Sequence, residues 1–161
     1  MQADAPACLA ATTAAALNLG KPLGYTSAAL AAAALLAVCT ASFTGHALGA
    51  AAVLFWAGSW VAFLGQSYYG LRVLFDAQLF AQLAARLNAA LGGESSPEDA
   101  LATQLTHLDQ ALFSLGLAPK PVAPPRPLEA RVRGALRLLK CQAALLLGQL
   151  LLLGAALMQS L

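Results

Sequence analysis

Charged residues are absent from two long stretches of this chain, and that absence limits the possible folds more than any other feature. The fifty residues from Pro22 to Leu71 contain no Asp, Glu, Lys or Arg, and neither do the twenty-one from Cys141 to Leu161. A helix needs about 20 mostly apolar residues to cross the hydrocarbon core of a bilayer. The first stretch is therefore long enough for two crossings, and the second for one.

The composition agrees with this interpretation. Only 10% of the 161 residues are charged and 60% are apolar, whereas about 25% of the residues in a soluble domain are charged. We predict an all-α integral membrane protein with three transmembrane helices, the second of which extends into a cytoplasmic helical hairpin.

The first predicted span comprises residues 24–43 and follows an N-terminal cytoplasmic segment, residues 1–23. It is rich in alanine, and small residues let helix backbones approach closely. The alternative is a buried helix of a soluble bundle, which the clearer second span disfavours. Lys21 before an apolar run is also a feature of signal peptides, but the twenty residues that precede it argue against cleavage.

The second span is predicted at residues 48–69, so that residues 24–69 form a transmembrane hairpin. Because no proline occurs between Leu48 and Leu91, we expect one helix that continues well beyond the membrane. Its small residues and its aromatic residues fall on opposite sides. The face predicted to pack against another helix contains Ala51, Gly58, Ala62, Gly65 and Tyr69. Trp56 and Trp60 lie opposite and are candidates for contact with lipid or a partner.

Residues 70–117 are predicted to form the cytoplasmic hairpin. Gly92 and Gly93 end the long helix, and Ser96 with Pro97 marks the start of another. Its leucines repeat at spacings of three and four, as in a helix that packs on a partner; they are Leu101, Leu105, Leu108, Leu112 and Leu115. Gly116 is the expected stop.

A proline-rich linker is predicted at residues 118–127, followed by a basic helix start and the third span within residues 128–161. The leucine-rich span itself covers about residues 139–159. Arg133, Arg137 and Lys140 share one face of the basic turns. They are candidates for contact with anionic lipids or a partner, since long basic side chains extend to the headgroups.

The distribution of the nine Lys and Arg residues predicts the orientation. Lys21 precedes the first span, and the other eight lie between the second and third spans. A cytoplasmic N-terminus puts all nine on the cytoplasmic side, as the positive-inside rule requires. We therefore predict a multi-pass protein of the bacterial inner membrane with a periplasmic C-terminus.

Arg72 and Asp76 stand four residues apart where the second helix leaves the membrane. They are predicted to form an ion pair at the membrane boundary; participation in an ion path is the alternative. Gln66, Gln142 and Gln149 fall within or near the spans. Hydrogen bonds between helices are the expected role of these glutamines.

Known catalytic motifs are missing from the sequence. There is no P-loop, GxGxxG or HExxH, and Cys8, Cys39 and Cys141 form no CxxC pair. His46 and His107 fall on opposite sides of the predicted membrane, too far apart for a shared haem or metal. We therefore expect no catalytic, cofactor-binding or metal-binding residues, and a protein that is not an enzyme.

These features predict a non-catalytic structural or accessory subunit that anchors and positions the other subunits of a membrane assembly, either hetero- or homo-oligomeric. The alternative is a small homo-oligomeric transporter, channel or ion-coupled component. Nucleic-acid binding is not expected, because the basic turns lack interleaved aromatic residues.

Overall fold

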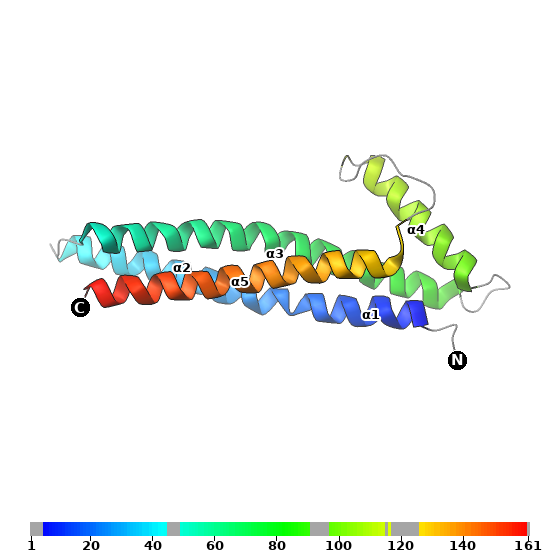
Figure 1. Cartoon of the computed structure of the whole chain (residues 1–161), viewed down its shortest axis with the longest axis horizontal. Helices are drawn as coiled ribbons and strands as arrows, with labels where there is room; N and C mark the ends of the chain where they lie inside the picture. Colours follow the sequence, from blue (N-terminus) through cyan, green and yellow to red (C-terminus); the bar gives the residue numbers. More distant parts are fainter. Residues whose placement is uncertain (1–4, 45–48, 91–96, 115, 117–125, 161) are drawn as a thin grey trace. The chain divides into compact units, whose positions relative to one another are not determined.

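The computed structural model describes residues 5–44, 49–90, 97–114, 116 and 126–160, and within them every regular element is an α-helix (Figure 1). The helices are α1 (Ala5–Asn18), α2 (Gly20–Phe43), α3 (Ala50–Ala90), α4 (Pro97–Ser114) and α5 (Leu128–Ser160). Three stretches are long and apolar enough to span a membrane: Ala5–Phe43, Ala50–Ala89 and Leu128–Gln159. The predicted turn around His46, the helix end at Gly92 and Gly93, and most of the proline-rich linker lie outside the described residues.

The first helical stretch is interrupted only briefly. Helix α1 ends at Asn18 and α2 begins two residues later, at Gly20. Pro22 accounts for the break, because its nitrogen cannot donate the hydrogen bond that would continue the helix to the Asn18 carbonyl. Proline is tolerated in the first turn of the new helix, where backbone N–H groups have no intrahelical partner. The predicted end at residues 20–22 is therefore a short break rather than the start of a loop.

Helices α3 and α4 have the predicted boundaries to within a few residues. Helix α3 is continuous for 41 residues, as the absence of proline indicated. Helix α4 begins at the predicted Pro97. Gly116 adopts the left-handed backbone conformation, with φ of 70°, and its N–H donates to the Phe113 carbonyl. This is the geometry in which glycine ends a helix.

The chain divides into two compact units, which we describe separately. Unit 1 comprises residues 1–18 and 75–136, and unit 2 comprises residues 19–74 and 137–161. Helices α3 and α5 contribute to both. Unit 2 thus contains α2, the first part of α3 and the last part of α5, which run side by side in Figure 1.

The buried residues of unit 2 recur every seven positions on each helix. They form three layers: Gly20, Gln66 and Gln142; Ser27, Ser59 and Gln149; and Ala34, Ala52 and Ala156. Contacts from Gly20 to Gln142 and from Ser27 to Gln149 show that α2 and α5 are parallel here. The cluster that joins Ala34 to Ala52 shows that α3 is antiparallel to them. A seven-residue repeat is the pattern of helices that coil around one another.

Unit 2 has small and polar side chains inside and large apolar ones outside. Each side chain of the three layers has at most 2% of its surface exposed, apart from Gly20, which is buried without a side chain. The exposed large residues include Leu36, Leu54, Val61, Leu71 and Leu151. A soluble bundle places its leucines inside, so this reversed arrangement is typical of helices surrounded by lipid.

Unit 1 has the opposite distribution. Its buried residues include Leu17, Phe80, Leu83, Leu87, Leu105, Leu128 and Val132. Gln78, Gln82, Arg86 and Asn88 on α3 are exposed, as the sequence predicted. A core of large apolar side chains covered by polar ones is the arrangement expected of helices that pack in water.

Replacement of Gly20 by alanine is expected to lower the stability of unit 2. A Cβ atom at this position would lie 2.8 Å from both Gln142 Oε1 and Val73 Cγ1. Overpacking of this kind costs about 1–3 kcal/mol. The measurement is thermal unfolding in a mild detergent.

Gly24→Ala is the matched control on the same helix. A Cβ atom at Gly24 would meet nothing within 4 Å, and alanine favours the helix by up to about 1 kcal/mol relative to glycine. Equal melting temperatures for the two variants would contradict the proposed close approach at Gly20.

Candidate functional site

The middle layer of unit 2 contains a reciprocal polar contact between α2 and α5. The Ser27 hydroxyl donates to Gln149 Oε1, and Gln149 Nε2 donates to the Ser27 carbonyl oxygen at 3.1 Å. Both side chains are completely buried. Hydrogen bonds between helices are the expected role of a polar group that is removed from water.

The glutamines of the neighbouring layer also bind α2. Gln142 Nε2 donates to the Gly20 carbonyl oxygen at 2.9 Å, and Gln66 Nε2 donates to that of Leu23 at 3.0 Å. Gly70 leaves room for the first contact, because a Cβ atom there would lie 3.2 Å from Gln142 Nε2. The three glutamines thus connect α2 to α3 and α5, as the sequence predicted.

Four further polar atoms are buried in unit 2 without a hydrogen-bond partner among the described residues. They are Trp56 Nε1, Ser59 Oγ, Gln66 Oε1 and Gln142 Oε1. The two glutamines donate through their amide nitrogens, so only their acceptor oxygens remain without a partner. The interior of unit 2 therefore holds more hydrogen-bonding capacity than its own helices use.

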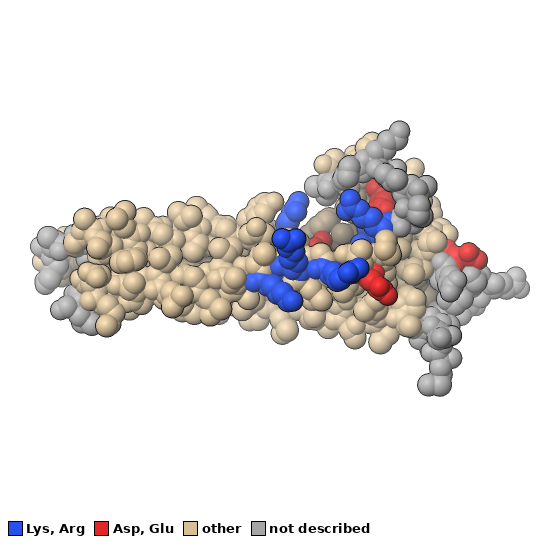
Figure 2. All heavy atoms as spheres, viewed as in Figure 1, with Lys and Arg blue, Asp and Glu red and all other residues tan. Residues whose placement is uncertain are grey.

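The charges of unit 2 are all positive and lie at one end. Its segments contain Lys21, Arg72, Arg137 and Lys140 and no acidic residue. Each cation is within five positions of Gly20, Gly70 or Gln142, which lie at one level of the bundle. The rest of unit 2 presents an uncharged surface on the face drawn in Figure 2.

The predicted packing face of α3 requires a correction. Trp56, predicted to face lipid or a partner, is only 8% exposed and packs with Ala34, Ala52, Leu153 and Ala156. Ala51, predicted to be buried against another helix, is exposed. The buried face is centred about one residue later than predicted, because it includes the polar Ser59 and Gln66, which a criterion based on small size omits.

The other residues of that predicted face lie at or near the contact with α5. Ala62 is buried and Tyr69 is half-buried. Added Cβ atoms at Gly58 and Gly65 would lie 3.4 Å and 3.3 Å from the side chains of Leu152 and Leu145. Trp60 is half-buried, and its ring packs edge-on against Phe63 with centroids 5.6 Å apart.

The remaining candidates are the charged residues of α3 and α5. Arg72 is exposed, and its guanidinium carbon lies 5.7 Å from the centre of the Tyr68 ring, which is within the range of a cation–π contact. Asp76 belongs to unit 1 and is half-buried. The ion pair between Arg72 and Asp76 stays a prediction. Arg133, Arg137 and Lys140 are exposed on α5.

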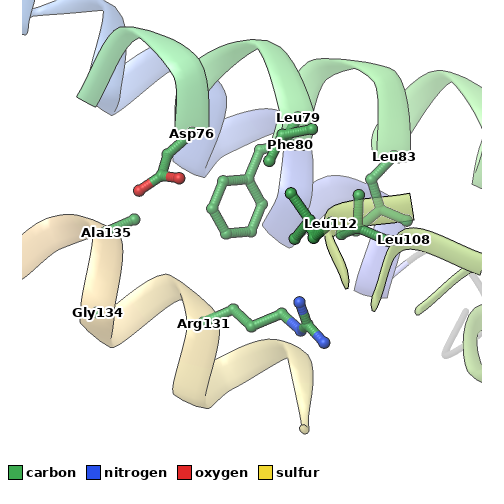
Figure 3. A pocket seen from close by; sticks show the side chains of 9 residues that line it. All are labelled: Asp76, Leu79, Phe80, Leu83, Leu108, Leu112, Arg131, Gly134 and Ala135. Atoms are coloured by element: carbon green, nitrogen blue, oxygen red, sulfur yellow. The ribbon is translucent and has the colours of Figure 1, made fainter. Parts of the chain in front are cut away.

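A pocket of about 220 Å³ lies in unit 1 between α3, α4 and α5 (Figure 3). Its lining is mostly apolar and includes Phe80 at the centre and Leu108 and Leu112 from α4. Two charged residues also line it: the Asp76 carboxylate points from α3 toward Gly134 and Ala135, while Arg131 lies nearer to Leu108. Two of the five predicted α4 leucines thus line a pocket, which the sequence did not indicate.

Arg131 is held by two contacts of its own. Its Nη2 lies 2.6 Å from Asp109 Oδ1, and its Nε donates to the Arg126 carbonyl oxygen at 3.2 Å. Both partners of the ion pair are largely buried, with side chains 16% and 18% exposed. The pair connects α5 to α4. On the other side of α4, Arg86 Nη1 donates to Gln104 Oε1 at 3.4 Å.

No group of three or more metal-binding side chains occurs among the described residues. His107 is exposed, and the three cysteines are free. The comparisons give no relative from which a role could be carried over: no family model, no curated protein and no solved structure matches this chain.

The contact between Ser27 and Gln149 is expected to stabilise the bundle by a measurable amount. Hydrogen bonds between membrane helices average about 0.6 kcal/mol and reach about 1.7 kcal/mol. We expect a coupling energy of about 0.5–2 kcal/mol in a double-mutant cycle of Ser27→Ala and Gln149→Leu. Unfolding in detergent or bilayers measures it, and additive effects of the two changes would contradict the contact.

Proposed function

We propose that this chain is a non-catalytic accessory subunit of a larger assembly in the bacterial inner membrane. Unit 2 is the membrane anchor, and unit 1 contacts partner subunits from the cytoplasm. The observation that carries this proposal is the reversal of the core between the units: polar and small side chains are buried in unit 2, and large apolar ones in unit 1. A bilayer around the first and water around the second account for both.

The reversal can be followed along single helices. On α3, the residues at seven-residue steps are Ala52, Ser59 and Gln66, then Val73, Phe80 and Leu87. All six are buried. The change from polar to large apolar falls between Gln66 and Phe80, which supports an exit from the membrane in that interval. Tyr68 and Tyr69 lie there, and tyrosine favours the headgroup region.

The charges support the proposed orientation. The four cations of unit 2 lie at one end, beside the layer that contains Gly20. All seven acidic residues belong to unit 1. An anchor whose cations face the cytoplasm follows the positive-inside rule and places the N-terminus in the cytoplasm and the C-terminus in the periplasm. Anionic lipids are the proposed neighbours of Arg137 and Lys140.

The second candidate, a homo-oligomeric transporter or channel, is supported by the buried polar atoms of unit 2. Two unpartnered glutamine oxygens and Ser59 Oγ lie along one stretch of the bundle. Against this candidate, Gln66 and Gln142 are at most 1% exposed and already bind α2 through their amide nitrogens. Packed side chains of this kind support helix association more directly than conduction.

The topology can be tested with cysteine labelling. In a background without the other cysteines, a membrane-impermeant maleimide should label Gln159→Cys in intact spheroplasts, because residue 159 is exposed at the proposed periplasmic end. Cys8, which is exposed on α1, should react only after the membrane is permeabilised. The reverse pattern would overturn the proposed orientation.

The accessory role can be tested by native mass measurement after purification in a mild detergent. We expect a stable complex that contains this chain together with at least one different protein. A complex of this chain alone would favour the transporter or channel, and a lone monomer would overturn the proposed function.

A further inference from the structure

The pocket of unit 1 has the size of an anchor site for one side chain. Its volume is about 220 Å³, whereas pockets for organic ligands and cofactors usually measure about 300–1,000 Å³. Its lining is largely leucine and phenylalanine, from three different helices. Apolar pockets of this kind bind the large anchor side chains on which protein interfaces depend.

The charges around the pocket are not equivalent. Arg131 is paired with Asp109 at 2.6 Å and also donates to the Arg126 carbonyl, so its positive charge is compensated within the unit. Asp76 interacts within the chain as well, but a carboxylate offers about four acceptor sites. Because its carboxylate points toward the α5 wall of the pocket (Figure 3), a second donor can approach it there. The charge at this side of the pocket therefore favours a cation.

Gly134 keeps the α5 wall of the pocket open. It lines the pocket beside Asp76, and a Cβ atom there would meet nothing within 4 Å. The absent side chain leaves space next to the carboxylate, where a larger residue would extend across the pocket. Glycine in the middle of a helix costs about 1 kcal/mol relative to alanine, and no close approach of another helix to Gly134 accounts for it.

We propose that this pocket receives a segment of a partner subunit that inserts one large apolar side chain and places a Lys or Arg against Asp76. The inference rests on the proposed accessory function and names the chemistry of the partner. Leucine, phenylalanine or methionine fits the apolar floor formed by Phe80, Leu83 and Leu112. The cation lies within one helical turn of this anchor, because Asp76 and Phe80 are one turn apart on α3.

Photo-crosslinking in cells tests the occupant. A benzoylphenylalanine at Leu79, which lines the pocket, should crosslink to one protein. The crosslinked peptide should contain an apolar residue with Lys or Arg within four positions. The same label at the exposed Gln78 is the control and should give at least tenfold less product. Adducts with lipid, with a second copy of this chain, or with a peptide without a cation would overturn the proposal.

Two pairs of variants test the pocket and the charge. Gly134→Phe should reduce the crosslink at least tenfold, whereas Gly134→Ala should retain it and melt no lower than the wild type. Asp76→Lys should abolish the crosslink, and a Lys→Asp or Arg→Asp change in the partner should restore it. Restoration separates lost charge complementarity from misfolding. No effect of either Asp76→Lys or Gly134→Phe would overturn the proposal.

The native mass of the wild-type complex separates the two levels of inference. If the complex contains another protein but Leu79 gives no protein crosslink, the proposed pocket occupant is wrong and the accessory function stands. If this chain has no protein partner, both are wrong.

Discussion

Hydrogen bonds from buried glutamines to the backbone of α2 are the contacts on which the arrangement of unit 2 depends. Gln142 and Gln149 are seven residues apart on α5, and they bind Gly20 and Ser27, which are seven residues apart on α2. Both contacts can form only in one register, because a shift by one residue would turn the amides away from the carbonyls. Apolar contacts between small residues are less selective, since lipid is as apolar as the helices themselves. The polar layers therefore specify which helices pair and at what height.

The same seven-residue repeat serves two environments. On α5, buried positions at seven-residue steps are Leu128 and Ala135 in unit 1 and Gln142, Gln149 and Ala156 in unit 2. In water, burial of large apolar side chains drives helices together, so leucine and phenylalanine occupy the core. Within a bilayer that driving force is lost, and close approach with hydrogen bonds replaces it. One geometric pattern thus continues while the physical cause of association changes, which explains why α3 and α5 each cross from one unit to the other without a break.

The helices follow from the sequence more readily than their packing faces do. Long apolar stretches without charge, together with Pro97, Gly116 and the absence of proline in α3, are sufficient to predict the helices. The face of α3 is harder to predict, because the core of unit 2 contains Ser59, Gln66 and Trp56 beside alanine. A search for small residues selects Ala51, which is exposed, and excludes Trp56, which is buried. The pocket could not be predicted either, since it depends on how α4 packs against α3 and α5 and on the pairing of Arg131 with Asp109.

The two candidate sites differ in what they require from outside the chain. The layers of unit 2 bury their polar groups within three helices of the same chain, and their amide nitrogens already have acceptors. An anchor built in this way is complete in its main contacts without another subunit. The pocket of unit 1 instead leaves apolar side chains accessible between three helices, beside a carboxylate. Accessible apolar surface is unfavourable in water unless something covers it. The physical need for a partner is therefore greater in unit 1, although the features of the sequence that first indicate membrane association lie in unit 2.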